Sequence, residues 1–285
     1  MKIFVAGGNS FIGSYLINEL LIAKHEVSVL VRPNSKFAIP LIAKPNLIIK
    51  ELEQVSINDL IEMEVVFNLI SAGVSPKKAS WETLEKVNIA FAIKLMEYSK
   101  KANVKRFIAT GSCLEYGNEA EKWDFIPPNA SLKPITPYAS TKAAGFILMN
   151  TFAKQNPIEF FYGRIFYAFG KGQYEKNFYP SLINAALSGE DFKISEGSQV
   201  LDFIEVEAVA KHLRIAAERN DIPTKEPLIV NIGSGEGIKL RDFARNKWEL
   251  FKAKGKLKIG EYQRDEITLK RLVANTTKLN QSNTL

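Results

Sequence analysis

Residues 2–13, Lys-Ile-Phe-Val-Ala-Gly-Gly-Asn-Ser-Phe-Ile-Gly, decide the fold of this chain. A short apolar run with β character, 2–6, leads directly into two glycines. Apolar side chains then recur at helical spacing from Phe11 to Ala23. The stretch therefore predicts a buried strand, a tight glycine turn and a helix that begins on the turn.

Strands and helices continue to alternate beyond this first unit. Helical spacing of apolar residues predicts long helices over 81–102 and 138–155. The intervening runs are too apolar for strands with one solvated face, so they indicate a parallel sheet covered by helices on both sides. The expected fold class is α/β, with a doubly wound parallel sheet. The runs that predict further strands are 26–31, 47–52, 65–70, 106–110 and 160–166.

Composition excludes several classes of protein. The net charge is +7, but the basic residues are scattered rather than gathered with aromatic residues, so nucleic acid is not expected as a partner. No apolar run approaches the ~20 residues of a membrane span, and no membrane partner is expected. The single cysteine, Cys113, cannot form an intrachain disulfide, which favours a reducing compartment and a cytoplasmic protein. The two histidines, His25 and His212, lie in unrelated contexts, so no metal site is expected.

The glycine turn is typical of dinucleotide binding. Gly7 and Gly13 occupy the outer positions of a Gly-x-x-Gly-x-x-Gly spacing, and Ser10 takes the central one. A small side chain at this position fits beneath a pyrophosphate, to which Ser10 could donate a hydrogen bond. Backbone N–H groups at Phe11 and Ile12, together with the helix dipole, would face the same anion.

The end of the second predicted strand bears on the choice of cofactor. An acidic residue there would bond the ribose 2′-hydroxyl of NAD. This chain has Arg32, Ser35 and Lys36 instead, and a guanidinium can grip a 2′-phosphate with paired hydrogen bonds. The sequence therefore favours NADP(H). NAD(H) and a merely solvated basic loop stay open as alternatives.

Tyr138-Ala-Ser-Thr-Lys142 predicts an acid–base site. A free tyrosine has a pKa of about 10, and a lysine one helical turn later lies on the same face. At roughly 5 Å and an effective dielectric near 20, the ammonium would favour the phenolate by about 3 kcal/mol, or roughly two pKa units. Ser112, at the end of a predicted strand, is placed to bond a substrate oxygen. A second Tyr-x-x-x-Lys, 167–171, contains Gly170 and follows a strand, so we interpret it as chance.

These motifs resemble an extended short-chain dehydrogenase/reductase of the NAD-dependent epimerase/dehydratase family, in the branch that modifies nucleotide-activated sugars. The resemblance extends from Lys2 to about Leu279. The residues that carry it are 7–13, 110–117 and 137–142, with later matches at 164–173, 202–206 and 231–235.

The resemblance implies roles for individual residues. Ser112, Tyr138 and Lys142 would be catalytic, and the last two would also contact the cofactor. Asn88 would lie near the cofactor, although a structural role in bonding the backbone is an equal alternative. Homodimerisation through the two long helices is a family expectation. Further cofactor contacts would come from Ser71, Ala72, Gly73 and Phe166, and substrate contacts from Ser112, Asn177 and Arg264.

The regular alternation loosens after Gly170, where helices are expected over 177–187 and 240–252 and a strand over 228–232. We expect residues 1–168 to form an NAD(P)-binding Rossmann domain, to which 200–234 return. Residues 169–285 would mostly form a smaller, mixed α/β substrate-binding domain.

Departures from the family pattern narrow the expected reaction. Sugar-nucleotide dehydratases place an Asp-Glu pair directly after the hydroxyl residue, where this chain has Cys113 and Leu114. Leu201 replaces an arginine that commonly grips the substrate pyrophosphate. We expect NADPH-dependent reduction of a nucleotide-activated 4-keto-6-deoxyhexose, in deoxysugar and surface-polysaccharide biosynthesis. The alternatives are an NAD-dependent sugar-nucleotide epimerase and a non-enzymatic protein that senses the dinucleotide.

Overall fold

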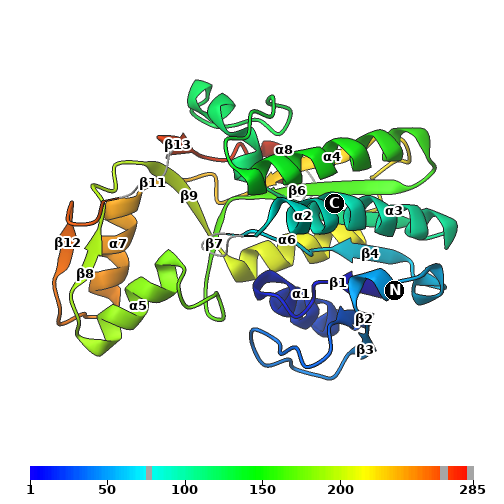
Figure 1. The fold of residues 1–285 in the computed structure, drawn as a ribbon, viewed down its shortest axis with the longest axis horizontal. Helices are drawn as coiled ribbons and strands as arrows, with labels where there is room; N and C mark the ends of the chain where they lie inside the picture. Colours follow the sequence, from blue (N-terminus) through cyan, green and yellow to red (C-terminus); the bar gives the residue numbers. More distant parts are fainter. Residues whose placement is uncertain (75–78, 264–268, 281–285) are drawn as a thin grey trace.

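The computed structural model describes residues 1–74, 79–263 and 269–280. Its main sheet has seven strands in the order β10-β6-β5-β4-β1-β2-β3, and every neighbouring pair is parallel (Figure 1). This confirms the doubly wound α/β fold class. The strands are β1 (Lys2–Ala6), β2 (Glu26–Val31), β3 (Asn46–Ile49), β4 (Val65–Asn68), β5 (Arg106–Ser112), β6 (Glu159–Ile165) and β10 (Leu228–Ile232).

Helices cover both faces of this sheet, which is why its central strands are almost wholly apolar. On one face, α1 (Phe11–Ile22) and α6 (Val206–Glu218) contact each other and bury residues such as Leu16 and Leu213 against the strands. On the other face, α3 (Ala92–Lys101) and α4 (Pro137–Gln155) bury Leu95 and Met149. Burial of apolar area on both sides is the main stabilising term for a sheet of this kind.

The long helix expected over 81–102 is interrupted. It consists of α2 (Trp81–Glu85), a π-helical turn η3 (Lys86–Phe91) and α3. Gly145 of α4 packs against this turn so closely that a Cβ there would lie 2.3 Å from the Asn88 carbonyl oxygen. The π turn thus lies at the closest approach of the two helices, and π turns often mark functional sites.

The beginning of α4 follows from local sequence. Thr136 is its N-cap residue and accepts a hydrogen bond from the Ala139 N–H over 3.2 Å. Pro137 occupies the first helical turn, where its missing N–H has no structural cost. Tyr138 is therefore fixed at the start of the helix.

A smaller region lies apart from the main sheet, at the left of Figure 1. Its core includes Leu182 of α5 (Phe178–Ser188) and Trp248 of α7 (Leu240–Leu250). Between the two regions runs a mixed sheet that contains parallel and antiparallel pairs. The remaining strands are β8 (Phe192–Ile194) with β12 (Leu257–Ile259), and β9 (Val200–Glu205) with β7 (Tyr167–Phe169), β11 (Gly237–Lys239) and β13 (Arg271–Leu272).

The segment 200–234 divides between these sheets: β9 belongs to the mixed sheet, whereas α6 and β10 pack on or extend the main one. The domain boundary near residue 168 stays a prediction. Single-turn helices complete the described chain: η1 (Leu52–Gln54), η2 (Ile57–Leu60), η4 (Cys113–Tyr116), η5 (Asn118–Lys122) and α8 (Thr277–Asn280).

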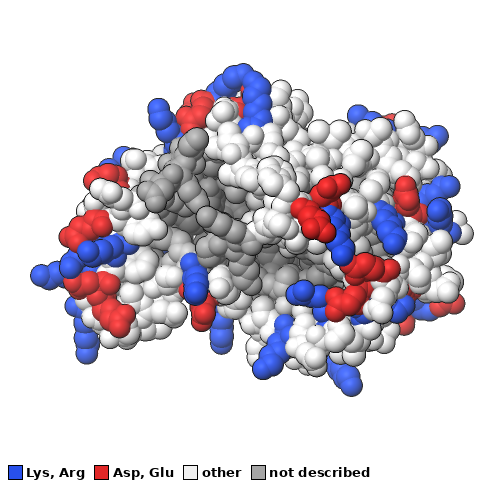
Figure 2. All heavy atoms as spheres, viewed as in Figure 1, with Lys and Arg blue, Asp and Glu red and all other residues white. Residues whose placement is uncertain are grey.

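The surface does not gather charge of one sign on the face drawn in Figure 2. Basic and acidic side chains are interspersed there over both regions of the molecule. Several of them form ion pairs, such as Lys2 with Glu62. Within the described part of the chain, none of the helices has the length and apolar character that a membrane crossing requires.

Candidate active site

The glycine turn between β1 and α1 has the shape that an anion site requires. Gly7 has a φ of +84°, and a Cβ on Gly13 would lie 2.2 Å from the Gly7 carbonyl oxygen. Ser10 caps the helix, and its Oγ accepts a hydrogen bond from the Gly13 N–H over 3.1 Å. As the first helical residues, Phe11 and Ile12 have N–H groups without intrahelical acceptors. The turn therefore fits a dinucleotide pyrophosphate, with Ser10 acting also as the N-cap.

The segment after β2 leaves two basic side chains exposed. The Ser35 N–H and hydroxyl both donate to the Arg32 carbonyl, over 3.2 and 2.6 Å, and Asn34 takes a φ of +59°. These bonds form a tight turn from which Arg32 and Lys36 extend into solvent. Among the described residues, no carboxylate forms an ion pair with the Arg32 guanidinium. As far as the described residues go, the guanidinium is available to an anionic ligand.

Asn88 lies in the π turn, and both the oxygen and the nitrogen of its side-chain amide form hydrogen bonds within the protein. Its Oδ1 accepts from the Ala72 N–H over 2.8 Å and from the Ser71 hydroxyl over 3.4 Å. Its Nδ2 donates to the Ala72 carbonyl over 3.1 Å and to Thr141 Oγ1 over 2.9 Å. These contacts favour the structural alternative, in which Asn88 ties the loop after β4 to α4 and so fixes Ser71 and Ala72.

The structure brings Ser112, Tyr138 and Lys142 together at the carboxyl end of β5. Burial raises the pKa of Tyr138, and the nearby hydroxyls of Ser71 and Ser112 oppose that rise. Ser112 is the last residue of β5 and begins the turn η4. Lys142 is buried, and its Nζ donates to the Thr110 carbonyl over 2.6 Å.

The expectation that Lys142 lowers the pKa of Tyr138 is wrong for this structure. Although Tyr138 keeps some solvent contact, burial of its hydroxyl raises the pKa to about 12, which outweighs the opposing effect of the two serine hydroxyls. Burial also lowers the pKa of the Lys142 ammonium, which bonds a carbonyl rather than the phenol. Desolvation disfavours the charged form of both groups.

The sequence patterns predicted no chemical role for Glu115. Its side chain is fully buried beside Ser112, and its Oε1 accepts from the Ser112 N–H and from the Tyr162 hydroxyl, each over 2.8 Å. Its Oε2 accepts from Arg164 Nε over 2.7 Å. The sequence feature that could have indicated a buried partner for Glu115 is Arg164, a charged residue within the otherwise apolar run 160–166.

Residues predicted to contact substrate are less clearly placed. Asn177 is the N-cap position of α5, and its buried Oδ1 has no hydrogen-bond partner in the described part of the chain. Phe166, predicted to contact the cofactor, is only 3% exposed and shares an apolar cluster with Cys113 and Leu201. That cluster leaves the Phe166 ring little surface for a ligand. Arg264 lies outside the described residues.

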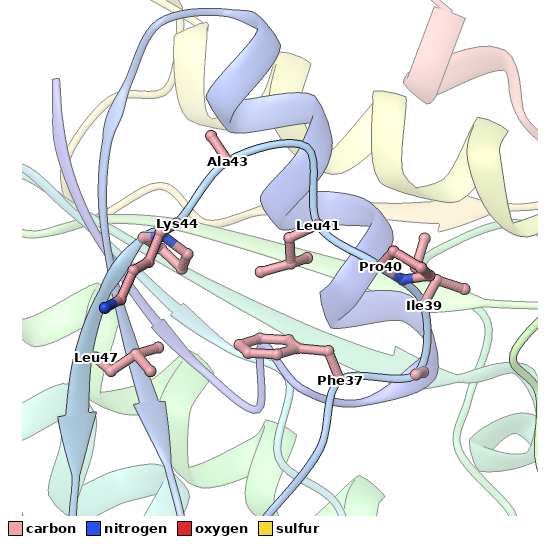
Figure 3. A pocket seen from close by; sticks show the side chains of 9 residues that line it. Phe37, Ile39, Pro40, Leu41, Ala43, Lys44 and Leu47 are labelled. Carbon is pink, nitrogen blue, oxygen red and sulfur yellow. The ribbon is translucent and has the colours of Figure 1, made fainter.

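A hollow of about 600 Å³ lies elsewhere, along the chain that leads from β2 into β3 (Figure 3). Its walls are mainly apolar, with Phe37, Leu41 and Leu47 among them. None of the predicted catalytic residues lines it. Within the described residues, no group of three or more His, Cys, Asp or Glu side chains is placed to hold a metal ion.

Comparison with known proteins agrees with this geometry. Residues 3–233 match the family described as "NAD dependent epimerase/dehydratase family". The chain belongs to that family. The match includes the glycine turn, the serine at the end of β5 and the helix that carries Tyr138 and Lys142.

Relatives within the NAD-dependent epimerase/dehydratase family act on sugar nucleotides. UDP-glucose 4-epimerase of Lactobacillus helveticus is 25% identical over 264 residues, 83% of this chain and 78% of that protein. CDP-abequose synthase of Salmonella typhimurium is 24% identical over 245 residues, 85% of this chain and 78% of that protein.

Solved structures of similar fold include MoeE5 bound to UDP-glucose and NAD, with a TM-score of 0.83 and 25% identity over 99% of this chain and 91% of that one. UDP-N-acetylglucosamine 4-epimerase from Methanobrevibacter ruminantium has a TM-score of 0.87 and 24% identity, over 100% of this chain and 92% of that one. This chain is thus a member of the NAD-dependent epimerase/dehydratase family, with the fold of these solved structures.

Proposed function

We propose that this protein reduces a nucleotide-activated 4-keto-6-deoxyhexose with NADPH, within deoxysugar biosynthesis. The observation that carries the choice of NADPH is the end of β2. There Arg32 and Lys36 are exposed, and no acidic side chain of the described chain pairs with the guanidinium. A 2′-phosphate would accept paired hydrogen bonds from Arg32, whereas a ribose 2′-hydroxyl would gain little from it.

The residues at the end of β5 support carbonyl reduction. The bound cofactor supplies a hydride to the ketone carbon. The Ser112 hydroxyl donates a hydrogen bond to the ketone oxygen, and Tyr138 transfers its proton to that oxygen. Because burial raises the pKa of Tyr138 to about 12, the phenol holds this proton throughout the neutral range. Lys142 holds the α4 end of the site to Thr110 and can bond the nicotinamide ribose.

The test is oxidation of NADPH and NADH, at matched concentrations, with a panel of nucleotide-linked 4-keto-6-deoxyhexoses and with product identification. We expect NADPH consumption with one substrate and the corresponding 6-deoxyhexose as product. Tyr138→Phe should retain NADPH binding and lose turnover. Tyr98→Phe is the matched control, because Tyr98 also lies one helical turn from a lysine, with Lys94 Nζ 5.4 Å from its ring. Full turnover by Tyr138→Phe would exclude the proposed acid.

An NAD-dependent sugar-nucleotide epimerase is the second candidate, and the similarity to UDP-glucose 4-epimerase favours it. An epimerase regenerates its cofactor in each cycle. The same assay therefore distinguishes the two functions: epimerisation would convert a nucleotide sugar with no net NADPH consumption and with dinucleotide retained by the purified protein.

A further inference from the structure

A buried ion pair, Glu115 with Arg164, lies directly beneath the proposed reacting centre. Glu115 is 0% exposed and Arg164 is 1% exposed. Besides the carboxylate, Arg164 Nη1 donates to the Pro128 carbonyl over 3.0 Å and to the Tyr116 hydroxyl over 3.3 Å. The pair therefore joins three segments that surround the site: η4, β6 and the part of the chain before α4 that contains Pro128.

Aromatic rings and close backbone packing hold this pair in one arrangement. The guanidinium carbon of Arg164 lies 4.4 Å from the Phe146 ring centroid and 5.0 Å from that of Tyr116. A Cβ at Gly111 would lie 2.4 Å from Glu115 Oε1, so no side chain fits between β5 and the carboxylate. The β5 backbone therefore lies directly against the Glu115 carboxylate.

Stability alone is a poor explanation of such a pair. Removing two charges from water costs free energy that their attraction often fails to recover, and apolar replacements of such pairs are often as stable. A second, partly buried ion pair, Arg106 with Glu159, lies at the opposite end of β5 and β6. Arg106 also donates to the Ala216 and Ala217 carbonyls at the end of α6, which is a structural role.

We propose that Glu115 is a positioning residue that holds Ser112 against Tyr138. Its Oε1 bonds the Ser112 N–H over 2.8 Å, and Arg164 fixes the carboxylate from behind. The Ser112 hydroxyl is thereby kept on the side of the site that faces the Tyr138 phenol. The proposal rests on the function proposed above, because it assigns Glu115 to the site that contains those two residues.

The negative charge of Glu115 acts on the same site. It raises the pKa of Tyr138 and opposes the fall in the pKa of Lys142 that burial causes. Glu115 thus favours the protonated forms of both groups. The ionisable groups that surround the carboxylate are Arg164 and Tyr162 from β6, Tyr138 and Lys142 from α4, and Cys113 and Tyr116 from its own turn.

Glu115→Gln tests the proposal, with Glu159→Gln as the control at the partly buried pair with Arg106. We expect Glu115→Gln to lower kcat by about tenfold to a hundredfold, as a small displacement of reacting groups does, with KM values within about threefold. The basic limb of the kcat–pH profile should move to lower pH, because loss of the carboxylate eases deprotonation of Tyr138. Glu159→Gln should lower Tm but keep kcat and the pH profile. Equal kcat values and profiles in the two variants would overturn the proposal.

A second variant covers the case in which Glu115→Gln fails to fold. Glu115→Leu combined with Arg164→Met replaces the pair by apolar side chains, which restores packing without a stranded charge. A folded double variant should show the same loss of kcat, and wild-type kcat in it would disprove a positioning role.

One measurement separates failure of this inference from failure of the proposed function. In protein labelled with ¹³Cζ-tyrosine, the Tyr138 resonance is assigned by comparison with Tyr138→Phe and followed against pH. We expect Glu115→Gln to lower its titration midpoint, whatever reaction the enzyme catalyses. If wild-type protein reduces no substrate, the proposed reaction fails. An unchanged Tyr138 midpoint would overturn the role of Glu115.

Discussion

The Lys142 ammonium donates to the Thr110 carbonyl over 2.6 Å and so ties α4 to β5, two residues before Ser112. Both ends of this bond are buried. The bond fixes the helix that carries Tyr138 relative to the strand that carries Ser112. The distance between acid and hydroxyl is therefore set by contacts between two elements rather than by either motif alone.

Lys142→Met should break this link without a large change in volume. We expect kcat to fall by about a hundredfold, because the position of Tyr138 relative to Ser112 is no longer fixed and the Thr110 carbonyl loses its hydrogen-bond donor. Dinucleotide affinity should fall about tenfold with loss of a charged hydrogen-bond donor. Steady-state kinetics and cofactor titration measure both effects. Lys154→Met, at the exposed end of the same helix, is the control, and an equal effect in the two variants would contradict the assignment.

Alkaline pH should destabilise the fold through buried tyrosines. Burial raises the pKa of Tyr116 to about 12, above the value of about 10 of an unfolded chain. Its contribution to stability is therefore complete below pH 10 and is lost as the pH rises towards 12, by up to about 1.4 kcal/mol per pH unit. Urea unfolding of wild type should show this decline.

Tyr116→Phe should reduce the slope of that decline. The variant also loses the 2.6 Å bond to Asn231 Oδ1, so it should be less stable at pH 7 by about 1–3 kcal/mol. Equal slopes in the two proteins between pH 10 and 12 would mean that other groups control alkaline unfolding.

Local patterns in the sequence are sufficient to predict the strands and the helix that lie next to the site. The glycines at 7 and 13, the apolar run 2–6 and the start of a helix at Phe11 coincide with the structure, because each depends on residues a few positions apart. The strand expected over 106–110 extends to Ser112. The last residues of this strand are small and polar. The apolar pattern therefore predicted an end two residues before the observed one.

The electrostatics of the site could not be predicted in this way. Glu115 and Arg164 are 49 residues apart, and their meeting depends on the β5–β6 register, which pairs Gly111 with Arg164. The pKa of Tyr138 depends on burial by elements that converge from the whole chain. Sequence spacing predicted Lys142 on the same helix face but not that its ammonium bonds the Thr110 carbonyl.

Arg32→Ala should change the choice of cofactor. The exposed guanidinium has no ion pair within the described chain, so the variant should leave the fold unchanged. We expect NADPH affinity to fall about tenfold to a hundredfold, the worth of a charge-assisted contact, and NADH affinity to stay within about twofold. Fluorescence titration with both dinucleotides measures the change. Arg245→Ala, an exposed arginine of α7, is the control, and parallel losses for NADPH and NADH would refute a 2′-phosphate contact.

Apolar side chains exposed on α2 and α4 favour a homodimer through these helices. Trp81 is 63% exposed, Ile147 54% and Leu148 45%, and the two helices contact each other. Burying such side chains against a second copy would release about 25 cal/mol per Å² of apolar area. Sedimentation of wild-type protein should therefore show a dimer, and Ile147→Lys with Leu148→Lys should yield a folded monomer. Leu250→Lys, 67% exposed on α7, should remain dimeric, and a monomeric wild type would contradict this interface.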